Sequence, residues 1–260
     1  MGEKMKNAPI FYTLGKIQFN PILDMHNHIE SLQTAFRKSG LSGFTVASMP
    51  SIQVDTSSVP PKLTHSNQQR WRFANSRRNA ELILFNNSIV YQTTNYDTDD
   101  EFISHILDLT AVVHKQVGLD FVDQIGFRTL DAIIPDDRHP LEALLRPELL
   151  GFYLGQSGDL RQSHLEATFQ IGSTGALVRR VVILHGQLGL PIDLMPVSLQ
   201  IDPRFTSINS WHAILDTDSA ERQQFDFDPD KIGERLRAVK EVASQAFYDA
   251  VTKTALDLWR

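Results

Sequence analysis

Asp24, His26 and His28, in the string LDMHNHIE, are residue types that bind divalent metals. On a strand, His26 and His28 would point the same way, because side chains alternate with a period of two. On a helix they would lie about 200° apart around the axis. Apolar residues recur every three or four positions through 24–38, which predicts a helix. We therefore expect both histidines to flank a buried helical stripe, with His26 near Glu30, rather than to bind a metal.

A second acidic candidate lies in the string AILDTDS. Asp216 and Asp218 would share one face of a strand, and such a carboxylate pair can hold Mg²⁺ for phosphoryl chemistry. The alternative is a strand that leaves the core into a polar turn, where aspartates bond the local backbone. The second interpretation is favoured, so we predict no metal and no cofactor. A metal-dependent hydrolase or nuclease using Asp216 and Asp218 is kept as an alternative.

Four arginines cluster around the string RWRF. On a strand, Arg70 and Arg72 would lie on one face and the two aromatic residues on the other, with Arg77 and Arg78 close by. An arginine-bearing sheet face could contact nucleic-acid phosphates. The alternative is a half-buried strand with one solvated face. A net charge of −6 favours that alternative, because nucleic-acid binding usually shows as a basic excess.

Arg128 and Asp131 interrupt the apolar string QIGFRTLDAI. A charge within a buried strand needs a partner. Arg128 would pair with Asp131 or with another acid, or reach into a cleft between two lobes. These two residues are the cleft candidates.

Other motifs are missing. The chain has 260 residues and no cysteine, which excludes disulfides, thiolate metal sites and cysteine nucleophiles. Its glycine-rich strings match neither a dinucleotide-binding motif nor a P-loop, and there is no nucleophile elbow. No signal peptide or membrane-spanning apolar run is visible, which predicts a cytoplasmic protein without a membrane partner.

Along the sequence, the expected secondary structure consists of groups of consecutive strands, each followed by a helix. Strands are expected at 10–19, 43–55 and 121–134, in two runs within 80–96 joined by a hairpin turn at Asn86–Asn87, and in four runs between 164 and 219, one of them at 193–202. A polar loop is expected at 56–69. Helices are expected over 98–118, with Thr98 and Glu101 as a capping box, and from Asp228, with Pro229 at its first position.

This order predicts an α+β fold with largely antiparallel sheet and long amphipathic helices, because strands do not alternate singly with helices. Each half ends in strands followed by a helix. We therefore expect an N-terminal lobe over 1–140 and a C-terminal lobe over 141–260, with duplication as the hypothesis for their origin. One continuous domain is the alternative.

Several strings are similar to a sporadically distributed, functionally uncharacterised bacterial family that is known only through a numbered family model. The resemblance runs from about Asn7 to Trp259, and its landmarks are FNP at 19–21, WRF at 71–73, IGFR at 125–128 and LDTD at 215–218. The chain departs from that family after residue 22, where the family has a helix without paired histidines. The resemblance implies no activity or site residue. The family's patchy occurrence implies an accessory role in bacterial (antiviral) defence or a toxin-linked module.

No set of catalytic residues converges, so we predict a non-enzymatic binding protein that acts through a protein partner or as a homo-oligomer. Nucleic-acid binding through Arg70, Arg72, Arg77 and Arg78 is the second hypothesis.

Overall fold

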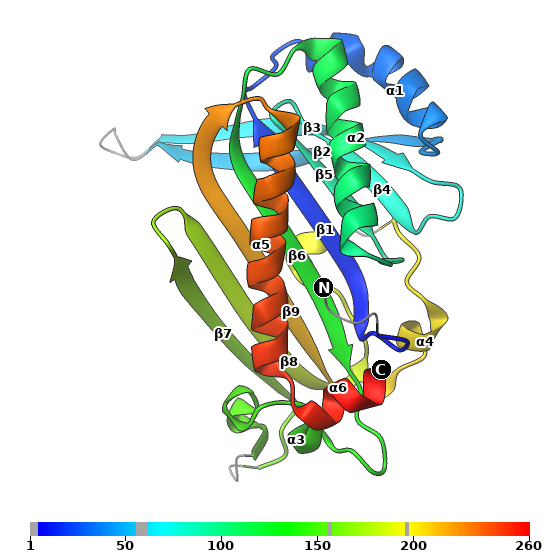
Figure 1. Ribbon diagram of the computed structural model, residues 1–260, viewed down its shortest axis with the longest axis vertical. Coiled ribbons are helices and arrows are strands. Elements are labelled where there is room, and N and C mark those ends of the chain that lie inside the picture. The colour runs from blue at the N-terminus through cyan, green and yellow to red at the C-terminus, as the bar shows by residue number, and fades with distance from the viewer. Residues whose placement is uncertain (1–4, 56–61, 155–157, 196–197) are drawn as a thin grey trace.

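Nine strands pair into one antiparallel sheet in the computed structural model, which describes residues 5–55, 62–154, 158–195 and 198–260 (Figure 1). Their order is β2-β3-β4-β5-β1-β6-β9-β8-β7, and every neighbouring pair is antiparallel. The predicted α+β class with antiparallel sheet is confirmed. The strands are β1 (Ile10–Phe19), β2 (Gly43–Asp55), β3 (Lys62–Ala74), β4 (Ala80–Leu84), β5 (Ser88–Thr93), β6 (Phe121–Ile133), β7 (Gln162–Ile171), β8 (Gly175–Gln187) and β9 (Asn209–Asp226).

β1 and β6 lie side by side at the centre of the sheet. β1 pairs with β6 in a register that places Thr13 opposite Thr129. β5 and β9 flank them, because β5 pairs with β1 and β9 pairs with β6. Hydrogen bonds therefore continue through the sheet across the expected lobe boundary at residue 140. The division into two lobes stays a prediction.

Three helices cover one face of this sheet. They are α1 (Ile29–Lys38), α2 (Asp99–Val117) and α5 (Pro229–Ala250), and α2 and α5 run side by side over the central strands (Figure 1). Their apolar residues form one core cluster with the sheet. On β1, Gly15 leaves room for α2, since a Cβ there would lie 3.0 Å from side-chain atoms of Phe102 and Ile106. A residue without a Cβ is therefore favoured at this close approach.

Local capping determines where the two longer helices begin. The Thr98 hydroxyl accepts a hydrogen bond from the Glu101 backbone N–H, and Gly118 ends α2 in a left-handed conformation, as predicted. The Asp228 carboxylate accepts from the N–H groups of residues 230 and 231, with Pro229 at the first position of α5. Both predicted starts are confirmed. Among the described residues, no helix has the length and apolar character needed to cross a membrane.

Short helical turns complete the chain. They are η1 (Met25–His28), α3 (Leu141–Leu144), η2 (Pro147–Leu149), η3 (Gly151–Leu154), η4 (Ile192–Leu194), α4 (Pro203–Thr206) and α6 (Lys253–Trp259). α3 and α6 pack beside the C-terminal end of α5 in a second apolar cluster.

The connection between β8 and β9 crosses the second face of the sheet. Its apolar residues, including Leu199 and Phe205, form a third cluster with β1 and β6. The Gln200 N–H donates to the Arg78 carbonyl at 2.6 Å, which holds the connection against the β3–β4 turn. The prediction of a strand at 193–202 is wrong for the described residues. They form part of η4 and a stretch of chain that pairs with no strand.

Residues 62–69, expected as loop, belong to β3 and pair with β2. Polar composition misled this prediction, because polar side chains do not prevent the backbone hydrogen bonds that pair two strands. Residues 56–61 of the same expected loop lie outside the described residues. The hairpin turn expected at Asn86–Asn87 is confirmed between β4 and β5.

Candidate functional site

A cavity of about 700 Å³ lies on the helical face of the sheet, between the start of α2 and the second half of α5. β6 forms its floor with Phe127, Thr129 and Asp131, and the chain leading into β1 forms a further wall. The cavity thus lies between one helix from each half of the chain. The other lining residues are Met5, Ala8, Pro9, Ile10, Tyr96, Asp97, Thr98, Asp99, Asp100, Ile103, Arg237, Lys240, Glu241, Ala243, Ser244, Phe247 and Tyr248.

Asp131 is the buried carboxyl group of this cavity. Its side chain projects from β6 toward the helices, opposite Ile10 on β1 and Leu215 on β9, and the residue is only 4% exposed. Burial raises the pKa of Asp131 to about 7, against the opposing effect of a hydrogen bond with Thr129. The negative charge of Asp216 beyond the sheet raises this pKa further. Asp131 forms no ion pair with any described residue.

The start of α2 forms the rim, where the polar groups are paired. Lys240 of α5 forms an ion pair with Asp99 in the first turn of α2. The Tyr96 hydroxyl donates a short hydrogen bond to the same carboxylate. Burial raises the pKa of Tyr96, and this hydrogen bond raises it further. Asp99 therefore ties α2, α5 and the chain before α2 together.

Aromatic rings line the walls of the cavity. Tyr96 packs edge-on against Phe127, with ring centroids 6.5 Å apart, and Phe247 contacts Tyr248 at 5.6 Å on α5. The wall thus combines apolar faces with a few polar groups, which is the usual composition of a small-molecule pocket.

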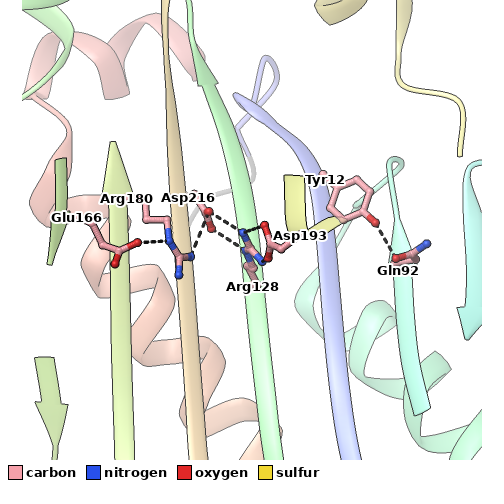
Figure 2. A network of polar contacts seen from close by, with 7 residues as sticks. All are labelled: Tyr12, Gln92, Arg128, Glu166, Arg180, Asp193 and Asp216. Carbon is pink, nitrogen blue, oxygen red and sulfur yellow. Dashed lines mark hydrogen bonds and ion pairs between the residues drawn. The ribbon is translucent and has the colours of Figure 1, made fainter. Parts of the chain in front are cut away.

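A ladder of charges occupies the second face of the sheet (Figure 2). The Arg128 Nε and Nη2 atoms donate to the two carboxylate oxygens of Asp216, each at 2.7 Å, and Nη1 donates to Asp193 at 2.5 Å. Arg180 on β8 donates to Asp216 at 3.3 Å and to Glu166 on β7 at 2.5 Å. The ladder therefore runs across four strands and reaches η4 through Asp193.

Of the alternatives stated for Arg128, pairing with another acid is the one observed. Its partners are Asp216 and Asp193 rather than Asp131, which lies on the other face of β6. Of the two cleft candidates, only Asp131 lines the cavity.

Asp216 and Asp218 share one face of β9, as predicted, where Asp216 lies opposite Leu130 and Asp218 opposite Arg128. Asp216 is 1% exposed, and both of its oxygens accept bonds from arginine. Burial raises the pKa of Asp218, partly offset by Arg128. The described residues contain no group of three or more residues placed to hold a metal ion.

The predicted arginine face is divided by the fold. Trp71 and Phe73 enter the core, as expected for the opposite face of β3. Arg72 is 8% exposed, and its Nη2 atom donates to Glu81 at 2.7 Å and to Ser198 at 2.8 Å. Arg70 is half-buried on β3. Arg77 and Arg78 are exposed in the turn that follows.

Tyr12 and Gln92 extend the cluster around Arg72. The Tyr12 hydroxyl donates to Gln92 at 2.6 Å (Figure 2). Gln92 in turn donates to Glu81 at 2.6 Å. Arg72 is thus part of a buried hydrogen-bonded network and is not presented to solvent.

His26 and His28 lie in η1, immediately before α1, and Met25 at the start of η1 is buried. The predicted helix over 24–38 is therefore confirmed in its main part, with a 3₁₀ first turn. His28 lies 3.4 Å from Asp24, rather than His26 pairing with Glu30 as expected. The two histidines form no metal-binding group with other described residues.

Tyr96, Lys240 and the wall residues of α5 were not identified from the sequence. Asp131 was identified as a candidate, because an acid in an otherwise apolar strand is unusual. The sequence carries no local signal for the others, since they meet only when α2 and α5 pack side by side.

No known protein-family model matches the chain, and no curated protein matches it either. The resemblance to a sporadically distributed bacterial family, with its implied role in defence, stays a prediction.

Proposed function

We propose that this chain is a non-enzymatic binding protein that holds a partner molecule in the cavity between α2 and α5. The observation that carries this proposal is the buried Asp131 carboxyl group at the floor of a cavity of about 700 Å³. That volume is in the range that encloses a small molecule or a protruding side chain. A buried carboxylate without a cationic partner is costly, so it either takes up a proton or is stabilised by a cationic ligand.

The contacts around the cavity support binding more than turnover. Covalent catalysis needs a nucleophile next to a base that a third group orients. The described lining residues include neither histidine nor cysteine. Asp99 is engaged by Lys240 and Tyr96, and Asp131 by Thr129. The polar groups of the cavity thus position a ligand rather than activate one.

The two alternative functions have less support. Nucleic-acid binding through the arginines of β3 would require Arg72 to leave its buried bonds to Glu81 and Ser198. Metal-dependent hydrolysis through Asp216 would require both of its oxygens to exchange arginine for a cation.

We also infer that the cavity lies at the junction of two related halves of the chain. β1 and β6 are the two central strands, and β5 and β9, the last strands before α2 and α5, pair with β1 and β6 respectively. The segments from β1 to α2 and from β6 to α5 would then be repeats that share one sheet, divided between α2 and β6 rather than at the expected residue 140.

The proposal is tested by purifying the tagged full-length chain from the organism that encodes it, with two variants. Ser244→Trp fills the cavity from α5, whereas Ala238→Trp adds the same ring at an exposed α5 position outside the cavity. Mass spectrometry then identifies co-purified small molecules and proteins. We expect a stoichiometric species that Ala238→Trp retains and Ser244→Trp loses. A species that Ser244→Trp retains, or none with the unmodified chain, would refute the proposal.

A further inference from the structure

We infer that the cavity between α2 and α5 takes an organic cation with an alkylammonium group, for which Asp131 is the counter-ion. This inference rests on the proposed function and adds the chemical class of the ligand. An alkylammonium group has two sources, a free small amine or a lysine side chain of a partner protein. The chemistry of recognition is the same for both.

The charge of the lining favours a cation over an anion. Of the charged lining residues that the structure describes, five are acidic and two are basic. One of the basic residues, Lys240, is already paired with Asp99. The acidic residues are Asp97, Asp99, Asp100, Asp131 and Glu241.

The start of α2 does not offset this charge. The positive end of a helix dipole can attract an anion. Here the Thr98 hydroxyl already accepts a hydrogen bond from the Glu101 N–H group, and three acidic residues occupy the first turn. Helix capping explains Asp99 and Asp100 without a ligand. It does not explain Asp131, which lies on a strand.

Asp131 is the group whose charge a cationic ligand would balance. It is 96% buried, lines the cavity and forms no ion pair with any residue that the structure describes. Its raised pKa has the same cause, because burial disfavours a charge that no cation balances. An ammonium group at this position would form a charge-assisted hydrogen bond, which is stronger than a neutral one.

The aromatic walls suit the alkyl part of such a ligand. Tyr96, Phe127, Phe247 and Tyr248 present apolar ring surface around the cavity. The faces of such rings also attract cations. A ligand with an ammonium end and a short alkyl chain would therefore match both the floor and the walls.

Isothermal titration of the full-length chain with n-butylammonium, n-butanol and n-butyrate at pH 8 tests the inference. The three probes have similar shape and differ in charge. We expect n-butylammonium to bind roughly tenfold or more tightly than either other probe, and Asp131→Asn to lose that preference. The inference would be overturned if n-butanol bound as tightly as n-butylammonium or if n-butylammonium did not bind. It would also be overturned if Asp131→Asn kept the preference for n-butylammonium. Circular dichroism verifies that Asp131→Asn is folded, and Ser244→Trp gives a second loss-of-binding variant.

A blocked Gly-Lys-Gly peptide distinguishes the two sources. If the peptide binds more tightly than n-butylammonium, the source is a lysine of a partner protein. If it binds more weakly, the source is a free amine. Either order supports the inference, whereas binding by neither cation overturns it.

The failure of this inference differs from the failure of the proposed function. If n-butylammonium does not bind but Ser244→Trp still loses a co-purified species, the cavity binds a ligand of another class. If Ser244→Trp keeps that species, the proposed function fails whatever the amines do.

Discussion

Arg128 and Asp131, three positions apart on β6, project to opposite faces of the sheet. On one face Arg128 is compensated by the carboxylates of Asp216 and Asp193. On the other face Asp131 forms the floor of a cavity without a cationic partner among the described residues. One strand thus carries a satisfied charge and an unsatisfied one, and the two should respond differently to substitution.

Arg128→Met should destabilise the fold strongly. It would leave the Asp216 carboxylate, which is 1% exposed, without the two shortest of its hydrogen bonds. Removal of one partner from a buried ion pair typically costs about 3–5 kcal/mol. Urea denaturation measured at pH 7 gives the free energy of unfolding directly.

The control for Arg128→Met is Arg180→Met in the same ladder. The Arg180 side chain is 25% exposed, and its bond to Asp216 is longer, at 3.3 Å. We expect Arg180→Met to cost roughly 1 kcal/mol, as for a partly exposed pair. Equal losses for the two variants would show that Arg128 is not the main partner of Asp216.

Asp131→Asn should stabilise the unliganded protein, and more so as the pH rises. The pKa of Asp131 is 3.8 when unperturbed and about 7 in the fold. Between these values the folded state holds the proton more tightly, so the stability that Asp131 contributes at low pH is lost as the pH rises through 7. Asparagine has no such titration. The advantage of Asp131→Asn should therefore grow by on the order of 2–3 kcal/mol from pH 5 to pH 8.

Urea denaturation of Asp131→Asn and of the unmodified protein at both pH values measures the difference between their free energies of unfolding. The titration of groups that both proteins share cancels in that difference. The groups that line the cavity with Asp131 and could alter its titration are Tyr96, Asp97, Asp99, Asp100, Arg237, Lys240, Glu241 and Tyr248. Lys240→Met is a suitable control, because it changes the local charge without removing the buried carboxyl group. A stability difference between Asp131→Asn and the unmodified protein that is independent of pH would contradict the prediction.

The parts of the fold that the sequence predicts are those with local causes. Thr98 caps α2 and Asp228 caps α5 within three residues of their bonded N–H groups, so the pattern of residue types is sufficient. The spacing of apolar residues likewise predicts the helix that begins near Met25. Polar composition failed over 62–69, because β3 pairs there with β2 and polar side chains do not prevent backbone pairing.

The candidate site depends on contacts between distant segments. The sequence marks Asp131 as an acid in an apolar strand, yet it does not show which face the side chain occupies. The partners of Arg128 are 65 and 88 positions away, at Asp193 and Asp216. The cavity itself forms because α2 and α5, from different halves of the chain, pack on the same face of the sheet. No local pattern contains that information.

Gly15→Ala should destabilise the packing of α2 on β1. An added Cβ would lie 3.0 Å from the side chains of Ile106 and Phe102, which must then shift. Overpacking of this kind typically costs about 1–3 kcal/mol. Thermal unfolding compared with Gly189→Ala checks this expectation. Gly189 has no heavy atom within 4 Å of the added Cβ, so its substitution should change stability by less than about 0.5 kcal/mol. Two equal effects would show that the contact of Gly15 with α2 is not tight.

Asp228→Ala should weaken the start of α5. The Asp228 carboxylate accepts hydrogen bonds from the backbone N–H groups of Asp230 at 2.9 Å and Lys231 at 3.3 Å, and alanine would leave both without this acceptor. Loss of an N-cap typically costs about 1 kcal/mol. Asp226→Ala is the matched control, since Asp226 is an exposed aspartate two positions earlier that caps no helix. Both variants lose one negative charge, so the difference between their free energies of unfolding in urea isolates the cap. Equal stabilities would mean that Pro229 and the packing of α5 on the sheet are sufficient to begin this helix without the carboxylate.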